Sequence, residues 1–480
     1  MTAGSEVHGL GEQVAGRLTS LLGPDRVSVD AVDLKEHAVD WSPRALLARR
    51  TGEPAGAPLA VVRPRDVTEV RRLLTWAHEE RVPLVPFGGG SSVVEGVVGR
   101  GLVVVDMRAL DHISQIDPKS RLVTVGAGVT GPELREALAA HGFMLGHEPQ
   151  SHDISSVGGW IATRACGQLS ARYGGIEKLV AGLEAVLPGG RVLRSKVVPR
   201  RSTGPDLAAL MLGSEGTLGI VTEVTLRVSP VPEMRVDACI GFEHMRDAMA
   251  ACRALAQSRL EPTVVRAYDR EDSVLLTMSL DDPPTGPLLL MSFDGDDAAR
   301  RAESAVALCR GKRLDDALVE HWWNYRNAAV VEYTRLMSGT GMLGPHAIID
   351  TMEVAGTWTV LRELYHSLKD ALSGQADFVT CHVSHIYPDG ACLYFTLAKM
   401  CTDDDEAAAG IDRWWETGMS ACLAAGGSIS HHHGIGRTRA RWLPQELGAS
   451  FDVLREIKNA LDPHGIMNPG ALGLNQPEPA

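Results

Sequence analysis

The chain of 480 residues has no run of the roughly 18 to 20 apolar residues that would be needed to cross a bilayer. Its first residues also lack the charged and apolar regions of a secretory signal. The eight cysteines include no C-x-x-C pair and no dense framework of the kind that stabilises small secreted domains. These absences argue against a membrane-spanning or secreted protein and predict a cytoplasmic one with reduced thiols.

The chain also has fewer basic than acidic residues, with 47 Lys and Arg and 60 Asp and Glu, so its formal net charge is −13 at pH 7. The sequence shows no concentrated Lys/Arg stripe of the kind that a nucleic acid backbone would require. Nucleic acid is therefore not an expected partner. At about 150 residues for each domain, the length predicts two or three domains.

The first half of the chain predicts a short N-terminal segment followed by a mixed α/β domain. Residues 1–52 are expected to form a helix from Glu12 to Leu22 and then an irregular stretch from Ser42 to Gly52. Strand-like runs and helical patterns alternate over residues 53–232, and the predicted helices there are Val67 to Glu80, Gly131 to His141 and Ser155 to Cys166.

Residues 233–425 have the pattern of a second α+β domain. The strand-like runs are DACIGF, TVVRAY, PLLLMSF and ACLYFTL, and the helical patterns run from Met245 to Arg259, Asp297 to Lys312 and Asp405 to Ala425. The acidic run from Asp403 to Glu406 is expected to cap the last of these helices, because a helix N-terminus favours negative charge.

Three glycine-rich segments in the first domain are candidates for holding a cofactor. They are VPFGGGSSV at residues 85–93, QSHDISSVGG at residues 150–159 and GSEGTLGIV at residues 213–221. Glycine lets backbone N–H groups approach an anion such as a pyrophosphate, although any one segment is more often a structural turn. None is a G-x-G-x-x-G turn with a following acid or a Walker A loop, which disfavours a nicotinamide or ATP enzyme.

Together with the runs STGPD, GGSISHHHGIG and LDPHGIMNPG, these segments resemble the vanillyl-alcohol oxidase and p-cresol methylhydroxylase (PCMH-type) superfamily. Within it, they are most similar to the alkylglycerone-phosphate synthases, also called alkyldihydroxyacetonephosphate synthases. The resemblance implies an α+β fold with a two-subdomain PCMH-type FAD-binding domain over residues 53–232. It also implies a substrate (cap) domain over residues 233–425, and a C-terminal segment, residues 426–480, that returns to the FAD domain and completes the active site.

The resemblance also implies which residues contact FAD. Relatives that attach FAD covalently use a histidine in the first glycine loop, where this chain has Ser91 and Ser92, so noncovalent FAD is expected. The implied contacts are Pro86, Phe87, Gly88, Gly89, Gly90, Ser91, Ser92, Gln150, Ser151, His152, Asp153, Ile154, Ser155, Ser156, Thr163, Arg164, Ala165, Cys166, Glu215, Gly216, Thr217, Leu218, Gly219, Ile220 and Val221.

The C-terminal half contains the candidate catalytic residues. His431, His432 and His433 lie between glycine pairs, and histidine carries protons near neutral pH. Tyr394 lies in a strand-like run and by composition alone could be a core residue, but the synthases' catalytic tyrosine maps onto it. Arg266 falls where the family has an active-site arginine, with a surface salt bridge as the alternative. A further family arginine corresponds to Arg335, in a stretch whose length departs from the family's pattern.

A metal site is the competing interpretation of the same region. His382 and His385 could join the histidine tract as ligands for Zn²⁺ or a similar divalent ion. Flavoprotein 2-hydroxy-acid dehydrogenases, which resemble the chain more loosely, can use metal-bound histidines, but their glutamate before His-Gly is His432 here. We predict no resident metal.

The synthase resemblance implies an FAD-dependent enzyme that exchanges the acyl group of an acyl-dihydroxyacetone phosphate for a fatty alcohol through an adduct at flavin N5, without net redox. The alternative is an FAD-dependent oxidase or dehydrogenase of a 2-hydroxy acid or other small alcohol. A flavin-storing or scaffolding protein is the third interpretation, and it leaves the Tyr/His/Arg set unexplained. The expected partner is a small-molecule or lipid substrate, with peripheral membrane contact if the substrate is a lipid, and a homodimer is expected from relatives.

Overall fold

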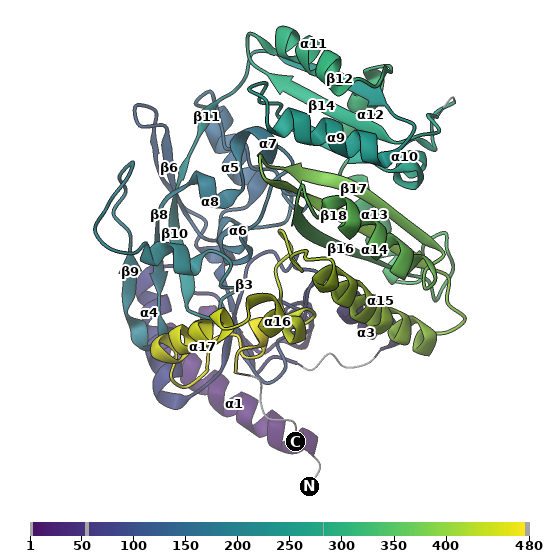
Figure 1. Ribbon diagram of the computed structural model, residues 1–480. Helices are drawn as coiled ribbons and strands as arrows, with labels where there is room; N and C mark the ends of the chain where they lie inside the picture. Colours follow the sequence, from purple (N-terminus) through teal and green to yellow (C-terminus); the bar gives the residue numbers. More distant parts are fainter. Residues whose placement is uncertain (1–2, 53–56, 282, 476–480) are drawn as a thin grey trace.

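The computed structural model describes residues 3–52, 57–281 and 283–475. In Figure 1 most of the purple and blue elements form one body together with the yellow C-terminal segment, and the green strands and helices form a second body beside it. This mixture of helices and antiparallel and parallel strands confirms the predicted α+β fold class. The predicted domain boundaries stay predictions, and residue 53, which lies on one of them, is outside the described residues.

The first sheet of the blue body has four strands, three of them parallel. Its order is β1 (Val27–Ser28), β2 (Ala60–Val62), β4 (Val103–Asp106) and β3 (Leu84–Phe87). Helix α4 (Val67–Glu80), predicted from its pattern, buries Val70, Leu73, Leu74 and Ala77 against this sheet, and α1 (Ala3–Leu22) packs beside it. Asp66 begins α4 by accepting a hydrogen bond from the Glu69 N–H.

The second sheet of the blue body is antiparallel. Its order is β5 (Ile113–Asp117), β6 (Leu122–Gly126), β10 (Ile220–Arg227), β8 (Val180–Val186) and β9 (Val192–Arg194). Around it lie the helices α5 (Gly131–Ala139), α6 (Val157–Thr163), α7 (Ser170–Tyr173) and α8 (Ile176–Leu179), and the strand pair β7 (Phe143–Met144) and β11 (Ser229–Pro230).

The green body is built on a seven-stranded antiparallel sheet, here called the cap sheet. Its order is β15 (Lys312–Arg313), β12 (Arg235–Gly241), β14 (Leu288–Asp294), β13 (Val264–Tyr268), β17 (Phe378–Ile386), β18 (Gly390–Lys399) and β16 (Ile348–Thr357). Four helices cover one face: α9 (Met245–Ala256), α11 (Ala298–Cys309), α14 (Leu361–Ser373) and α15 (Asp404–Ala424). The remaining helices are α10 (Arg270–Thr277), α12 (Ala317–Tyr325) and α13 (Ala328–Met337).

Strand alternation gives the cap sheet a second face, which is apolar where Leu288 and Leu290 pack against α12 and polar farther along the sheet. Apolar residues such as Val265, Ala267, Leu393 and Phe395 belong to the core under the four helices. Because successive side chains point to opposite faces of a strand, the residues between them point the other way. These residues are Arg266, His382, Tyr394 and Glu353, on β13, β17, β18 and β16, and we call this side the inner face of the cap sheet.

The N-terminal stretch from Ser42 to Gly52 corrects one expectation. It is not irregular but forms helix α3 (Pro43–Thr51), with proline in its first turn and Gly52 at its C-cap with φ of 74°. Leu47 of this helix is buried in the core of the cap sheet, against α15. The apolar residues of α3 are consecutive and flanked by arginines, so they show no helical spacing that would reveal a helix stabilised by a partner distant in sequence.

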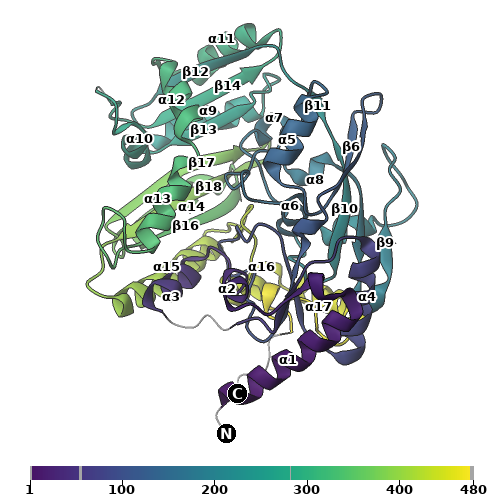
Figure 2. The same ribbon diagram turned by 180° about the vertical axis from the view of Figure 1, so that it is seen from behind.

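The C-terminal segment returns to the blue body, where α16 (Leu443–Leu447) and α17 (Ser450–Leu461) lie below its sheets in Figures 1 and 2. The fully buried Lys458 of α17 donates to the carbonyls of Thr217 (2.7 Å) and Met467 (2.9 Å) and pairs with Asp462. No helix among the described residues is long and apolar enough to cross a membrane.

Candidate active site

The first glycine loop follows β3 and offers unpaired backbone donors. In the described parts of the chain, no protein acceptor takes the backbone N–H groups of residues 88–92. A Cβ on Gly88 would lie 2.3 Å from the Ser156 Oγ, and one on Gly89 would lie 1.9 Å from the Ile154 carbonyl oxygen. The first two loops therefore pack backbone against backbone, and this set of free amides fits the pyrophosphate of a dinucleotide such as FAD.

The third loop meets the first in the same place. Gly216 has φ of 73°, and a Cβ on it would lie 2.4 Å from the Pro86 ring. Glu215 donates its backbone N–H to the Ala162 carbonyl (2.8 Å), next to Thr163 at the end of α6. The structure thus brings the three predicted FAD segments together, and the individual FAD contacts stay predictions.

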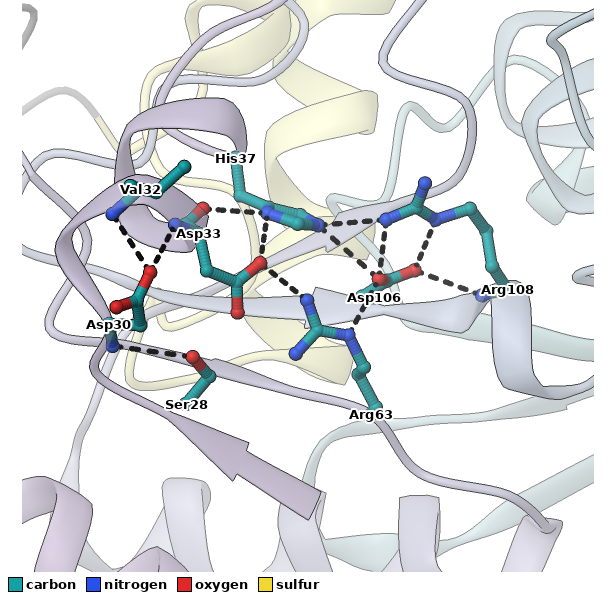
Figure 3. A network of polar contacts seen from close by, with 8 residues as sticks. All are labelled: Ser28, Asp30, Val32, Asp33, His37, Arg63, Asp106 and Arg108. Atoms are coloured by element: carbon teal, nitrogen blue, oxygen red, sulfur yellow. Dashed lines mark hydrogen bonds and ion pairs between the residues drawn. The ribbon is translucent and has the colours of Figure 1, made fainter. Parts of the chain in front are cut away.

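A polar network braces the first loop from the N-terminal side (Figure 3). The buried Asp106 carboxylate contacts the Arg108 guanidinium (2.8 Å), the Arg63 Nε (3.2 Å) and the His37 Nε2 (3.3 Å). Burial alone would raise the pKa of Asp106, but hydrogen bonds from His37 and Arg108 hold that pKa below its ordinary value. The Phe87 ring, which begins the loop, lies 4.6 Å from the His37 ring.

The N-terminal segment also contacts the loop directly. The Trp41 N–H donates to the Ser92 carbonyl (2.9 Å), and Asp40 accepts from the Gly96 N–H (2.7 Å). Residues 1–52 carry no recognisable functional motif, because side chains that act only by supporting a distant loop leave none in the sequence.

Substituting Gly89 by alanine should weaken FAD binding. The new methyl group would collide with the Ile154 carbonyl, and forcing apart well-packed backbone costs about 1–3 kcal/mol, which corresponds to an affinity lower by roughly 5- to 150-fold. The measurement is FAD titration of apoprotein by flavin fluorescence. Gly374→Ala is the matched control, because a Cβ there meets nothing within 4 Å. Equal FAD affinity in the two variants would show that the loops are not held together as described.

His147, just before the second loop, is a buried histidine with an unusual environment. It is 1% exposed, and in the described chain neither ring nitrogen has a hydrogen-bond partner. Burial lowers the pKa of His147 to about 3. Below the ordinary histidine pKa, His147 is therefore protonated in the unfolded chain but stays neutral in the folded protein. The free energy of unfolding consequently decreases as the pH falls.

His147→Phe should remove that loss. Between pH 8 and pH 5 the wild-type protein should lose about 2 kcal/mol through His147, at 1.36 kcal/mol for each pH unit below the unfolded pKa, and the variant should not. Urea unfolding of FAD-saturated protein at both pH values measures the difference. His141→Phe, at an exposed position, is the control. A loss of stability in the His147 variant as large as that in the wild type would contradict the prediction.

On the inner face of the cap sheet, Arg266, His382 and Tyr394 are neighbours. The His382 Nδ1 lies 2.8 Å from an Asp272 carboxylate oxygen, and its Nε2 lies 3.3 Å from the Arg266 guanidinium. Asp272 therefore favours the tautomer with hydrogen on Nδ1, which leaves Nε2 to accept from Arg266. The His382 ring stacks on Tyr394 at 4.9 Å. Arg266 is 8% exposed, and its Nε has no partner among the described residues, so this guanidinium can still bind an anionic oxygen.

The histidine tract lies beside this group. The His431 Nε2 is 2.8 Å from the Tyr387 hydroxyl, and the Tyr394 ring lies 6.0 Å from His432 and 5.5 Å from His433. Burial lowers the pKa of His433 to about 4 and that of His432 well below its ordinary value, so both are neutral at pH 7 and can accept protons. Burial raises the pKa of Tyr394 to about 12, so its hydroxyl is protonated at pH 7.

Arg335 does not join this cluster. Its side chain is 66% exposed on α13, where it lies 3.9 Å from the Glu332 carboxylate, three residues before it. The structure thus does not place Arg335 with the other predicted catalytic residues, and its catalytic assignment stays a prediction. Arg266, Tyr394 and the three histidines are the predicted catalytic residues that the fold brings together.

Part of the competing metal interpretation also has a geometric basis. The ligand atoms of Cys166, His385 and His431 lie within 4.8 Å of one another, as do those of Cys392, His431 and His432. A bulge in β17 between Val383 and His385 restores His385 to the inner face. His382 is in neither group. Burial raises the pKa of Cys166 to about 11, so its sulfur is a thiol, and the His385 Nδ1 bonds the Ser170 hydroxyl (2.6 Å).

Two buried glutamates lie beside the histidine tract: Glu353, which the sequence did not single out, and Glu215, which was expected only as an FAD contact. Glu353 on β16 is fully buried and pairs with Arg439, and Glu215 directs its carboxylate at the backbone beyond the histidine tract. Burial alone would raise the pKa of Glu353, but Arg439 and the histidines hold it below its ordinary value. The signal for Glu353 was a pair of acids, Asp350 and Glu353, inside the otherwise largely apolar run from Ile348 to Ala355, which was not recognised as a strand.

Two family profiles match the chain. One, described as an FAD binding domain, matches residues 58–196, and the other, described as FAD linked oxidases, C-terminal domain, matches residues 231–472. The chain belongs to the FAD-linked oxidases. Its cofactor is therefore FAD, as the free amides of the first loop and the packed glycines suggested. Noncovalent binding is consistent with Ser91 and Ser92 in that loop.

The relatives of this FAD-linked oxidase are named as different kinds of enzyme. The uncharacterized FAD-linked oxidoreductase YgcU of Escherichia coli (strain K12) is 31% identical, over 96% of this chain and 98% of that protein. Alkyldihydroxyacetonephosphate synthase of Caenorhabditis elegans is 30% identical, over 87% of this chain and 76% of its own. Mitochondrial D-lactate dehydrogenase (cytochrome) of Arabidopsis thaliana is also 30% identical, over 86% and 73%.

A solved alkyldihydroxyacetonephosphate synthase structure matches the FAD-linked oxidase described here with a TM-score of 0.78 and 26% identity, over 95% of this chain and 84% of that one. The fold predicted from the PCMH-type resemblance is thus confirmed. The relatives include both a synthase and a dehydrogenase at equal identity, so the family is established at the level of an FAD-linked enzyme.

Proposed function

We propose that this protein catalyses a synthase-type exchange, in which the acyl group of an acyl-dihydroxyacetone phosphate is replaced by a fatty alcohol. The observation that carries the proposal is the convergence of Arg266, Tyr394 and His431 to His433, the residues that the synthase resemblance singles out, on one buried face. In this exchange the C1–O bond to the acyl group breaks, the fatty acid leaves, and the alcohol oxygen forms the new C1–O bond. No electrons are gained or lost overall.

Each side chain has a role that its environment supports. Arg266, whose Nε has no hydrogen-bond partner in the described part of the chain, holds an anionic oxygen of the substrate. Tyr394, helped by a neutral His432 or His433, exchanges the proton at C1, and these histidines take the proton of the incoming alcohol. Bound FAD supplies the electrophilic ring against which C1 reacts. A lipid substrate would bring the protein into peripheral contact with a membrane, and a homodimer remains a proposal.

The test is anaerobic flavin absorbance with product analysis. Purified holoprotein is mixed with palmitoyl-dihydroxyacetone phosphate and hexadecanol, and separately with a panel of 2-hydroxy acids. Formation of the ether lipid with the flavin oxidised at the end supports the exchange. Persistent bleaching by a hydroxy acid without ether-lipid formation overturns it.

The second candidate is a 2-hydroxy-acid dehydrogenase, in which the same basic residues remove the hydroxyl proton while hydride passes to the flavin. One observation favours it: Cys166, His385 and His431 could hold a divalent metal that grips the substrate. Metal analysis of the purified protein and bleaching that is lost after chelation would support this candidate. Full activity in metal-free protein would remove its structural basis.

A further inference from the structure

The backbone around the three histidines is held from one side by a carboxylate of the cap sheet. We call residues 430–436 the histidine turn. Glu353 accepts the His433 N–H at 2.9 Å and the Ser430 hydroxyl at 3.0 Å, and it also accepts the His431 N–H. Glu353 therefore accepts hydrogen bonds from alternate backbone amides of the turn. Glu353 lies on β16, directly opposite Tyr394 on the neighbouring strand β18.

A second carboxylate, from the FAD-binding body, holds the other end of the histidine turn. The Glu215 carboxylate accepts the Ile435 N–H at 2.7 Å and the Gly436 N–H at 2.8 Å. Gly434 has φ of 89°, and a Cβ on it would lie 2.7 Å from a Glu215 oxygen, so the turn passes directly over this carboxylate. Both oxygens of the Glu215 carboxylate are therefore bonded to the turn.

Both carboxylates are buried, at 0% exposure for Glu353 and 8% for Glu215. Glu353 is charge-compensated by the fully buried Arg439, whose guanidinium also donates to the Ile429 carbonyl (2.6 Å). A buried charge is retained only where it is paired and fully hydrogen-bonded, as that of Glu353 is. Burial raises the pKa of Glu215 to about 7, and its carboxyl group is held by the backbone amides of the turn. This arrangement orients a segment that its flanking glycines would otherwise leave free.

We propose that Glu353 and Glu215 are positioning residues that clamp the histidine turn from the two bodies of the protein, and so fix His431, His432 and His433 opposite Tyr394. The clamp positions the three histidines and involves no chemical step, so it applies equally to the exchange reaction and to the dehydrogenase reaction proposed above. A misplacement of about 1 Å costs roughly 100-fold in rate when catalytic groups must align, so the clamp is expected to act on kcat.

The test combines amide hydrogen exchange, read by mass spectrometry, with kinetics on FAD-saturated protein. In Glu353→Gln and in Glu215→Gln, an amide nitrogen replaces one acceptor oxygen. Peptides covering residues 430–436 should then exchange at least about tenfold faster, while those from β18 keep the wild-type rate. With whichever substrate the wild type turns over, kcat should fall about 100-fold while KM stays within about twofold.

Asp350→Asn is the matched control, because Asp350 is a buried acid on the same strand that bonds Trp415 (2.8 Å) and Thr351 (2.7 Å) instead of the turn. Glu353→Gln also removes the ion-pair partner of Arg439. Glu215→Gln breaks no ion pair of the described residues, so it tests the clamp independently of that effect. Wild-type exchange in the turn of the Glu215 variant, or the same faster exchange and loss of kcat in the Asp350 variant, would overturn the clamp. The exchange measurement needs no substrate, so it stands whether or not the proposed reaction is found.

Discussion

Tyr394→Phe is expected to reduce turnover by about 100- to 10,000-fold while FAD stays bound, because a positioned proton-transfer group contributes that much. Tyr394 is stacked on His382 and lies beside His432 and His433. Since burial raises the pKa of Tyr394 to about 12, its hydroxyl is a proton donor at pH 7. It can act as a base only after passing its proton to a neighbouring neutral histidine.

The measurement is kcat of the Tyr394 variant beside its flavin content and far-UV circular dichroism. Tyr365→Phe is the control, since it removes another buried tyrosine hydroxyl, one that bonds Asp269 (3.2 Å) on the helix-covered side of the cap sheet. The control should keep its turnover within a few-fold of wild type. A Tyr394 variant that turns over as fast as the control would assign this tyrosine to packing alone, as its composition first suggested.

Arg439→Leu is expected to destabilise the folded protein by about 3–5 kcal/mol. Removing one partner of a fully buried ion pair leaves the other charge uncompensated, here that of Glu353. Without Arg439, burial would raise the pKa of Glu353 instead of leaving it depressed. A group whose folded pKa is raised gains stability from protonation as the pH falls, so the deficit relative to wild type should be smaller at pH 5 than at pH 8.

Urea unfolding at the two pH values measures both effects. The neighbouring Arg441→Leu is a close control, because Arg441 pairs with Glu416 at the surface, with both side chains 57% exposed, and such pairs contribute about 0–1 kcal/mol. If the two arginine variants lose similar stability, or if the deficit of the Arg439 variant does not depend on pH, Glu353 does not carry the buried charge described here.

Most regular elements with a clear period were predictable from sequence. The helix over Val67–Glu80 and the runs that became β13, β14 and β18 carry the apolar spacing that local backbone geometry requires. Helix α3 and the strands β16 and β17 were missed. Their sequences mix arginine, histidine and acids with apolar residues, and only burial against distant segments makes a helix or strand of them.

For the candidate site, the sequence by itself determined the cofactor class and the residue types of the chemistry. The glycine-rich segments and the histidine tract are local runs of sequence, and FAD followed from their resemblance to the PCMH-type superfamily. The tertiary structure alone decided which side chains meet. Strand alternation put Arg266, Tyr394 and Glu353 on one face, the same folding left Arg335 in solvent, and two carboxylates distant in sequence came to hold the histidine turn. Such contacts are non-local, because a buried charge is tolerated only where the folded chain brings its partners to it.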